Sequence, residues 1–484
     1  MRGILFSVVF MLLAIFTVVF AGCGEESEKD TDGDGVPDNV DNCADVANAD
    51  QKDANENSIG DACDKVTFAP FYTVLTHDPA NAALGETLFS VIGGEGIFFN
   101  EAWAGFGYMA SVPMAPPSVD RKVLVPEWEY ANFDEGEFNL VEVLSDGHLM
   151  GIRGKGGGEM IVEIDPLTVT VVRKFDDKEY SHDIVELPDG NLLVIWSETI
   201  PWEGNTPQTL KYEHVAVIDR AGNMLWDWNL WEEAPDAPAS EQYVAVVGLW
   251  SNCNALDFTP SPGWTVGQVV TGNIFLNCRV QNRLYNIAYP SGEIVWIMGD
   301  DGDFGEEMFH HPHDPQITYD TNENGERVMT HILLYDNREA PILGTATACP
   351  PDETCEDDIN PYSRAMEIAV DNQLNAEIVW KWPSPSMRDF EKYAVYSPIA
   401  GGVSRLPNGN ILVTNATVGG NPFIGAVTNA RIWELKRDGT LTGAQVVWDV
   451  EFSRGFSTFK AIRLPEGTTD TWASVPVSAI DTPE

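Results

Sequence analysis

Three of the eight histidines in the chain lie within one short stretch, FHHPHDPQITYD, at residues 309–320. They are His310, His311 and His313. Imidazole can act as a nucleophile, as a proton donor or acceptor, and as a metal ligand. Pro312 breaks the run because its ring fixes φ, so only His313 is followed by an aspartate and an alternating, strand-like sequence. This setting separates His313 from its two neighbours as the candidate for chemistry.

A second His-Asp pair has the same setting. His182, in SHDIVELPDGN, also precedes the first apolar strand of a sequence repeat. In the repeat between the two pairs, WSNCNALDF places Asn252 and Asn254 at the corresponding position, and Arg279 ends the strand NIFLNCR. If the repeats surround a common axis, these side chains meet there. A guanidinium, imidazole rings and amides at one place suit the binding and transfer of an anionic group.

Other roles for these histidines stay open at the level of sequence. The HHPH run can also be read as a zinc site, with Asp314 as the nearby carboxylate. His310 and His311 can cap the turn or contact substrate, and Asp314 can orient the His313 ring or point away from it. The other four histidines are expected to have structural or surface roles: His77, His148, His214 and His331.

A repeated strand pattern indicates how these residues are positioned. A short apolar strand recurs six times within residues 121–460, and its aromatic closing residues are Trp128, Phe175, Trp226, Trp296, Trp380 and Trp448. The second recurring element is a hairpin in which Asp-Gly or Asn-Gly joins two alternating strands. Almost no stretch has a helical period. The sequence therefore predicts an all-β chain with a six-bladed β-propeller at residues 121–460.

Residues 23–66 differ in composition from the repeats. DTDGDGVPDNVD is a twelve-residue loop of alternating oxygen ligands with glycine at its sixth position, the arrangement that calcium loops use. Its candidate ligands are Asp30, Asp32, Asp34, Asp38 and Asp41. A degraded second copy offers Asp53, Asn55, Asn57, Asp61 and Asp64. The two copies resemble thrombospondin type 3 repeats, which implies a spacer that binds Ca²⁺; the alternative is a disordered acidic linker.

The chain opens with one arginine and an uncharged apolar run from Gly3 to Gly22, followed by Cys23 and an acidic stretch. This pattern resembles a bacterial lipoprotein signal, with residues 1–22 as the signal peptide and Cys23 as the lipidated N-terminus. An ordinary signal peptide and an uncleaved anchor are the alternatives, and all three predict export. The resemblance implies a membrane-anchored lipoprotein that faces the periplasm or the cell surface.

The net charge of −47, from 28 basic and 75 acidic residues, argues against nucleic acid as a partner. An exported chain with six cysteines besides Cys23 is expected to form three disulfides. Sequence order suggests the pairs Cys43–Cys63, Cys253–Cys278 and Cys349–Cys355, and the sequence alone leaves other pairings open.

Several motifs occur in the order found in bacterial arylsulfate sulfotransferases. They are SHDIVELPDGNLLV, NCNALDF with NIFLNCRVQN, FHHPHDPQITYD with ILLYDN, SRAMEIAVD with IVWKW, and YSPIAGGVSRLPNGNILV. The resemblance implies a six-bladed propeller preceded by a small β-rich segment, here residues 67–120, and leaves 461–484 as a C-terminal tail. Such enzymes move a sulfuryl group from a phenolic sulfate donor to a phenolic acceptor through a sulfated histidine, without an organic cofactor.

The resemblance also implies roles for individual residues. It makes His313 the nucleophile, His182 a second catalytic histidine, and Arg279 the residue that holds the sulfate. Asn254 matches an asparagine of the family and is expected, with Asn252, to contact the substrate.

The chain departs from the family pattern at two positions. Asn252 replaces a family histidine, and Ala400 stands where the family tends to have threonine. An asparagine can hydrogen-bond a sulfuryl oxygen, but it carries no proton at neutral pH. Two functions therefore stay open: a sulfotransferase, and a tethered propeller that binds its ligand without turnover.

Overall fold

The structure is a computed structural model in which contacts divide the chain into two units, Met1–Val66 and Thr67–Glu484. The residues that it describes are 29–44, 47, 49, 51, 72–93, 108–113, 122–124, 137–154, 158–168, 170–202, 209–236, 248–305, 308–337, 363–383, 397, 400–418, 429–452, 456–466, 468 and 475–476. Within these ranges, no helix is long and apolar enough to cross a membrane.

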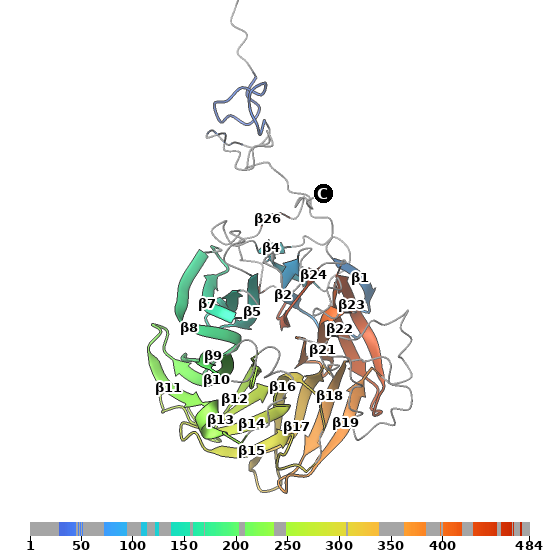
Figure 1. Ribbon diagram of the computed structural model, residues 1–484. Helices are drawn as coiled ribbons and strands as arrows, with labels where there is room; N and C mark the ends of the chain where they lie inside the picture. Colours follow the sequence, from blue (N-terminus) through green and yellow to red (C-terminus); the bar gives the residue numbers. More distant parts are fainter. Residues whose placement is uncertain are drawn as a thin grey trace, which may run out of the picture. The chain divides into compact units, whose positions relative to one another are not determined.

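Strands make up almost all the regular structure of the second unit, which confirms the all-β fold (Figure 1). One continuous sheet has the order β11-β10-β9-β8-β7-β6-β5. Its strands are β5 (Glu137–Val143), β6 (Leu149–Gly154), β7 (Gly158–Asp165), β8 (Thr170–Glu186), β9 (Leu192–Pro201), β10 (Thr209–Ile218) and β11 (Met224–Asn229). The short helix α1 (Leu230–Glu233) follows, and the Asn229 side chain caps it by accepting two backbone N–H bonds.

Two four-stranded sheets come next in the chain, each a simple antiparallel meander. The first contains β12 (Cys253–Pro260), β13 (Gly272–Cys278), β14 (Arg283–Tyr289) and β15 (Ile294–Gly299). The second contains β16 (Pro312–Thr321), β17 (Arg327–Asp336), β18 (Arg364–Val370) and β19 (Ala376–Trp382).

The last two sheets combine strands from both ends of the unit. The five-stranded sheet contains β1 (Tyr72–His77), β20 (Gly402–Arg405), β21 (Ile411–Val418), β22 (Asn429–Arg437) and β23 (Ala444–Phe452). The other contains β2 (Glu86–Gly93), β3 (Tyr108–Pro113), β4 (Lys122–Leu124), β24 (Phe456–Ser457), β25 (Ala461–Leu464) and β26 (Val475–Pro476). Strands from the expected N-terminal β-rich segment therefore pair with strands from the end of the chain.

The innermost strands follow one another around a central axis (Figure 1). The strands β5, β8, β12, β16 and β20 contact one another in this order, and β2 contacts β5. The ring closes where β25, which pairs with β2, contacts β21, which pairs with β20. Sheets arranged in a ring around an axis are the architecture of a propeller. The count of six blades stays a prediction, because β8 runs unbroken through two repeats and one sheet is assembled from both chain ends.

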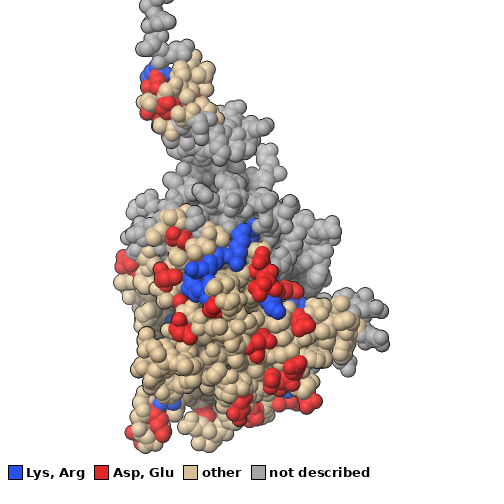
Figure 2. All heavy atoms as spheres, turned by 90° about the vertical axis from the view of Figure 1, so that its left-hand side faces the viewer, with Lys and Arg blue, Asp and Glu red and all other residues tan. Residues whose placement is uncertain are grey.

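Charged side chains of both signs lie on the outer surface of this ring (Figure 2). Figure 2 shows the side of the propeller that carries β8, where basic side chains gather in one stripe among acidic ones. Arg173 and Arg220 both pair with Glu163, a carboxylate that has no exposed side-chain surface. These arginines therefore neutralise a buried acid of the same sheet.

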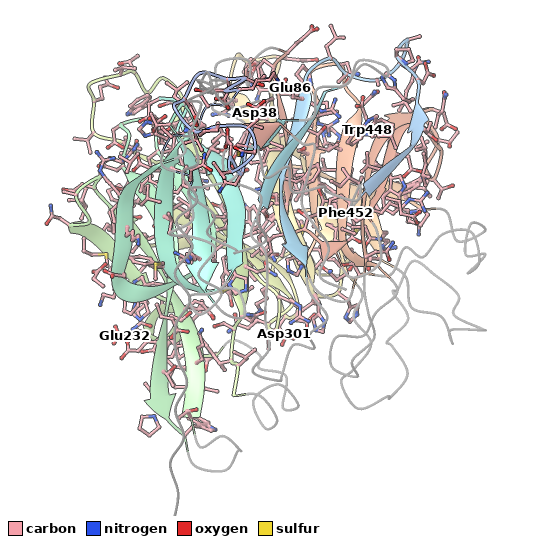
Figure 3. All side chains as sticks on the ribbon, turned by 90° about the horizontal axis from the view of Figure 1, so that it is seen from above. Asp38, Glu86, Glu232, Asp301, Trp448 and Phe452 are labelled. Atoms are coloured by element: carbon pink, nitrogen blue, oxygen red, sulfur yellow. A yellow bond between two sulfur atoms is a disulfide. The ribbon has the colours of Figure 1, made fainter. Side chains whose placement is uncertain are left out.

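The hydrophobic core fills the spaces between neighbouring sheets. Phe275 and Ile332 belong to a cluster between the sheets of β12–β15 and β16–β19. Phe452, labelled with Trp448 in Figure 3, packs against Phe89 of β2 with ring centroids 5.1 Å apart. Burying a large apolar side chain contributes about 1.5–3 kcal/mol. Apolar packing thus holds adjacent sheets together, and polar side chains can gather at the axis.

The outer strands repeat one irregularity. Trp226, Trp296, Trp380 and Trp448 each lie at a register shift, where the outer strand gains a residue relative to its partner. Such bulges increase the twist of a strand. Trp296, Trp380 and Trp448 are buried, as is Phe175, so the recurring aromatic residues serve the core. Trp128 lies outside the described residues.

Candidate active site

Left-handed backbone residues lie in or just before four neighbouring inner strands. His182 has a φ of 60°, Asn252 of 45°, Asp314 of 49° and Ala400 of 56°. Strand register shifts beside the first three of these residues. This conformation is strained for residues with a side chain, and bulges of this kind redirect side chains next to functional sites. The candidate site residues lie at this level of the propeller.

Arg279 is held against Asn252 and is only 4 % exposed. Its backbone N–H donates to the Asn252 carbonyl at 3.1 Å, and its Nη1 donates to Asn252 Oδ1 at 3.4 Å. The adjacent residues Cys253 and Cys278 form a disulfide, as sequence order predicted. Asn252 therefore orients the guanidinium through an acceptor oxygen, which a protonated histidine lacks.

His313 is buried near the start of β16, and its hydrogen bond determines its tautomer. Nδ1 of the ring lies 2.5 Å from Oδ1 of Asn337. The amide nitrogen of Asn337 donates to the carbonyls of Ser397 at 2.6 Å and Ala400 at 2.8 Å, so the amide oxygen must face the ring. An amide oxygen only accepts, and Nδ1 must therefore carry the hydrogen. The lone pair of the neutral ring then lies on Nε2, which is the atom available as a nucleophile.

Both His313 and His182 are neutral imidazoles at pH 7. Burial and the Arg279 charge lower the pKa of His313 to about 3, against smaller opposing effects of its hydrogen bonds with Asn337 and the His311 backbone. Burial, Lys211 and Arg279 likewise lower the pKa of His182 to about 3. His182 also lies close enough to contribute to the lowered pKa of His313. The structure thus brings His182, His313 and Arg279 together.

The loop before His313 is pinned by its backbone. The N–H of His310 donates to Asp336 at 2.8 Å, and the N–H of His311 donates to Asn282 at 3.0 Å. Asp336 is itself paired with the fully buried Arg364 at 2.8 Å. Both histidines are half-buried. Their backbone bonds fix the direction in which the chain enters β16.

Asn254 braces the same loop from the neighbouring sheet. Its Nδ2 donates to the Pro312 carbonyl at 3.3 Å, and its Oδ1 accepts from Asn277 at 2.6 Å. Asn277 also donates to the Pro312 carbonyl. These contacts place the Asn254 amide beside the residue that precedes His313, where it supports the position of β16.

Asp314 does not orient the His313 ring. Its Oδ2 accepts from the backbone N–H of Val403 at 2.9 Å, and its Oδ1 lies 3.1 Å from Nζ of Lys460. Of the two open readings, the carboxylate thus points away from the ring. Among the described residues, the HHPH run is not one of the groups that bring three potential metal ligands together.

Two other histidines, for which structural roles were expected, lie beside carboxylates of their own sheet. Nδ1 of His148 lies 2.7 Å from the buried carboxylate of Glu163. His214 lies 3.1 Å from Asp227 and stacks on Trp196 at 3.8 Å between ring centroids. The strands β1 and β17 contain His77 and His331, which are partly exposed.

Several predicted residues lie outside the described part of the chain. Cys43 is in a disulfide, but its expected partner is not described. The predicted residues outside the described ranges are Cys23, Asp53, Asn55, Asn57, Asp61, Cys63, Asp64, Cys349 and Cys355.

The first acidic loop has the geometry of a cation site. Carboxylate oxygens of Asp30, Asp32 and Asp34 lie within 4.8 Å of one another. Oδ2 of Asp32 is buried and has no hydrogen-bond partner among the described residues. Partial burial and the carboxylates of Asp34, Asp41 and Asp30 raise the pKa of Asp32. Asp38 instead binds Thr31 and Lys29. The donor set fits a hard cation such as Ca²⁺.

Two polar residues near the site were missed by sequence reasoning. Asn337 holds the His313 ring, and Lys460 pairs with the neighbouring Asp314. Asn337 ends the motif ILLYDN. This motif contributed to the family resemblance, but no role was assigned to the asparagine. Lys460 lies after the last recurring strand, which closes on Trp448, and no sequence pattern connects it with the axis.

The sequence of the propeller matches a known family. The arylsulfotransferase family model matches residues 127–454, and the thrombospondin type 3 repeat model matches 22–51. No curated protein matches the chain.

Similar structures include a protein of unknown function from Bacteroides caccae, which is 12 % identical over 78 % of this chain and 100 % of that one, with a TM-score of 0.39. The Dos1 propeller is 10 % identical over 80 % and 95 % of the two chains, with a TM-score of 0.32. These scores show no more than a distant likeness. The family match covers more than half of the 484 residues, and the chain therefore belongs to the arylsulfotransferase family.

Proposed function

We propose that this protein transfers a sulfuryl group from an aryl sulfate to a phenol through a sulfohistidine at His313. The observation that carries the proposal is the Asn337 hydrogen bond, which leaves the lone pair of a buried, neutral imidazole on Nε2. The Arg279 guanidinium beside it supplies donors for the sulfuryl oxygens. No organic cofactor is needed for this chemistry.

In the first step, Nε2 of His313 attacks the sulfur atom of the donor. A nitrogen–sulfur bond forms while the bond from sulfur to the phenolic oxygen breaks, and the phenolate leaves with the electron pair. Arg279 stabilises the charge that the sulfuryl oxygens carry. The bound anion offsets the Arg279 charge, so the pKa values of both histidines rise when the donor is present.

In the second step, the acceptor oxygen attacks the same sulfur and the nitrogen–sulfur bond breaks. The electron pair returns to Nε2 of His313, and the phenol loses its proton. His182 is the group proposed to receive this proton. Its Nδ1 is buried without a hydrogen-bond partner among the described residues, as expected for an atom that pairs with a bound substrate.

A chromogenic aryl sulfate tests the proposal. We expect phenolate release that depends on an added phenol, and one SO3 group on His313 when no acceptor is present, detected by mass spectrometry. His313→Asn should abolish both the adduct and the transfer, whereas His310→Asn and His311→Asn should keep the adduct. An adduct on His310 or His311, or full transfer by His313→Asn, contradicts the assignment.

The alternative function is a tethered propeller that binds aryl sulfates without turnover. Asn252 favours it, because this position replaces a family histidine and cannot carry a proton. In the structure Asn252 orients Arg279, which is compatible with binding alone. Measurable ligand binding without phenolate release or adduct supports this alternative.

We also propose that the N-terminal loop binds Ca²⁺ and that lipid on Cys23 anchors the exported protein to a membrane. Asp30, Asp32, Asp34 and Asp41 are the residues that would hold the ion, and the unpartnered oxygen of Asp32 supports this assignment. The ion would stiffen the spacer by offsetting carboxylate repulsion. Intact-mass analysis of the membrane fraction tests the lipid.

A further inference from the structure

Carboxylates of the inner strands link each sheet to the next. Oδ2 of Asp183 accepts from the N–H of Leu256 at 2.8 Å, and Oδ2 of Asp257 accepts from the N–H of Ile317 at 3.1 Å. Asp314 repeats this contact with the N–H of Val403. Each aspartate thus fastens its own inner strand to the following one. Two of the three come directly after a histidine of the candidate site.

These acids lie close enough to repel one another. Asp183 and Asp257 each interact electrostatically with Asp314, and Glu142 of β5 interacts with Asp183 and Glu186. Asp183 is 4 % and Asp314 8 % exposed, so water screens this repulsion poorly. A concentration of buried like charges requires a counter-charge.

Lys460 is the cation that faces them. It lies between β24 and β25, after the last repeat, and its Nζ is 3.1 Å from Asp314 Oδ1. Its side chain is 21 % exposed. It interacts electrostatically with Glu142, Asp183 and Asp257 as well. Burial alone would lower the pKa of Lys460, but the carboxylates of Asp314, Asp183 and Glu142 outweigh it and raise the pKa above its ordinary value.

The backbone of the neighbouring sheet is shaped for this contact. Gly402, at the start of β20, lies so close to Asp314 that a Cβ atom there would be 2.7 Å from Oδ2. A side chain at this position would force the Asp314 carboxylate to shift. The absence of a Cβ is therefore part of the arrangement.

We propose that the ammonium of Lys460 occupies a cation site built by Glu142, Asp183, Asp257 and Asp314, and that it positions the two His-Asp segments of the active site. The cation comes from the C-terminal segment, whereas the carboxylates come from four inner strands. Lys460 thus joins the chain end to the ring at the level of the chemistry. Its role is positioning, because its contacts are with Asp314 rather than with the reacting atoms.

Thermal unfolding at two pH values tests the cation site. Burial raises the pKa of Glu142 to about 7 and those of Asp183 and Asp257 to about 6. These three carboxylates are therefore largely ionised at pH 8 and partly protonated at pH 5. Lys460→Met should lower Tm by about 5 °C at pH 8 and by less than half as much at pH 5.

Matched variants separate charge from packing. Lys460→Arg should retain most of the stability at pH 8. Lys436→Met, which removes a lysine that donates to the neutral side-chain amide of Asn81, should change Tm equally at both pH values. Propylammonium added to Lys460→Ala at pH 8 should raise its Tm more than that of the wild type. Equal losses for Lys460→Met at both pH values, or no difference between Lys460→Met and Lys460→Arg, would overturn the proposal.

The positioning role rests on the proposed sulfotransferase function and has its own measurement. With phenyl sulfate, the rate of adduct formation at His313 should fall about tenfold in Lys460→Met. The reason is that the segment containing His313 and Asp314 is less well placed in this variant. An unchanged rate contradicts the positioning role. If the wild type forms no adduct, the proposed function fails, while the thermal measurements still decide whether Lys460 fills a cation site.

Discussion

At the scale of single residues, the chemistry depends on which nitrogen of His313 carries the hydrogen. Asn337→Leu removes the acceptor for Nδ1, so the ring can turn and place its hydrogen on Nε2. We expect adduct formation to slow by about 100-fold, the effect of a misplaced reacting group. Nitrogen NMR of ¹⁵N-histidine-labelled protein should show His313 leaving the Nδ1–H tautomer.

A matched control distinguishes this effect from general destabilisation. Asn410 is also a buried asparagine, and it donates to Glu434 and to the Asn81 carbonyl. Asn410→Leu should lower stability without changing the His313 tautomer. If both variants slow adduct formation equally, or the tautomer of Asn337→Leu is unchanged, Asn337 does not act through the ring.

The pH dependence of the first step reports the protonation state of the His313 imidazole. A pKa of about 3 for His313 and His182 means that both stay neutral down to pH 5. We therefore expect kcat/KM for the donor to fall by less than about tenfold from pH 8 to pH 5, and only as far as protonation of the carboxylates around Lys460 weakens the positioning of His313. An ordinary imidazole, with a pKa of about 6.5, would lose about 30-fold over this range. A decline of about 30-fold centred near pH 6.5 would show that the free enzyme does not lower the pKa values of the two histidines.

Sequence motifs identified His182, His313 and Arg279 as a group, and the structure does bring them together. They did not identify the contacts that hold each side chain. Asn337 is 24 residues from His313, and its amide is oriented by two carbonyls that follow much later in the chain. Such contacts depend on the three-dimensional arrangement of loops, for which local sequence carries no period or spacing.

At the scale of elements, the acidic loop at residues 30–41 should bind one Ca²⁺. Calorimetry of the full chain should lose one site in Asp32→Ala, since this residue contributes the unpartnered oxygen. Asp176→Ala, at an exposed position on β8, serves as the control and should leave that site intact. Equal calcium binding by the wild type and Asp32→Ala would contradict the loop assignment.

The strands themselves were predictable where the pattern is local. Alternating apolar residues and the Asp-Gly or Asn-Gly turns indicated hairpins such as β8–β9 and β20–β21, and both are present. Pairing between distant segments was not predictable. β1 joins β23 and β2 joins β25 across most of the chain, and apolar alternation is compatible with many such partners.

At the scale of the whole molecule, the net charge of −47 opposes the approach of an anionic donor. Attraction to Arg279 acts at short range, where the guanidinium is 4 % exposed and poorly screened by salt. The acidic exterior acts over longer distances, and its field is reduced as the Debye length falls from about 30 Å at 0.01 M to about 10 Å at 0.1 M salt. Raising the salt concentration over this range should therefore increase kcat/KM for an aryl sulfate and leave kcat/KM for a neutral phenol unchanged. Steady-state rates with each substrate varied decide the point: a fall in kcat/KM for the donor would mean that local attraction, rather than the acidic exterior, controls its entry.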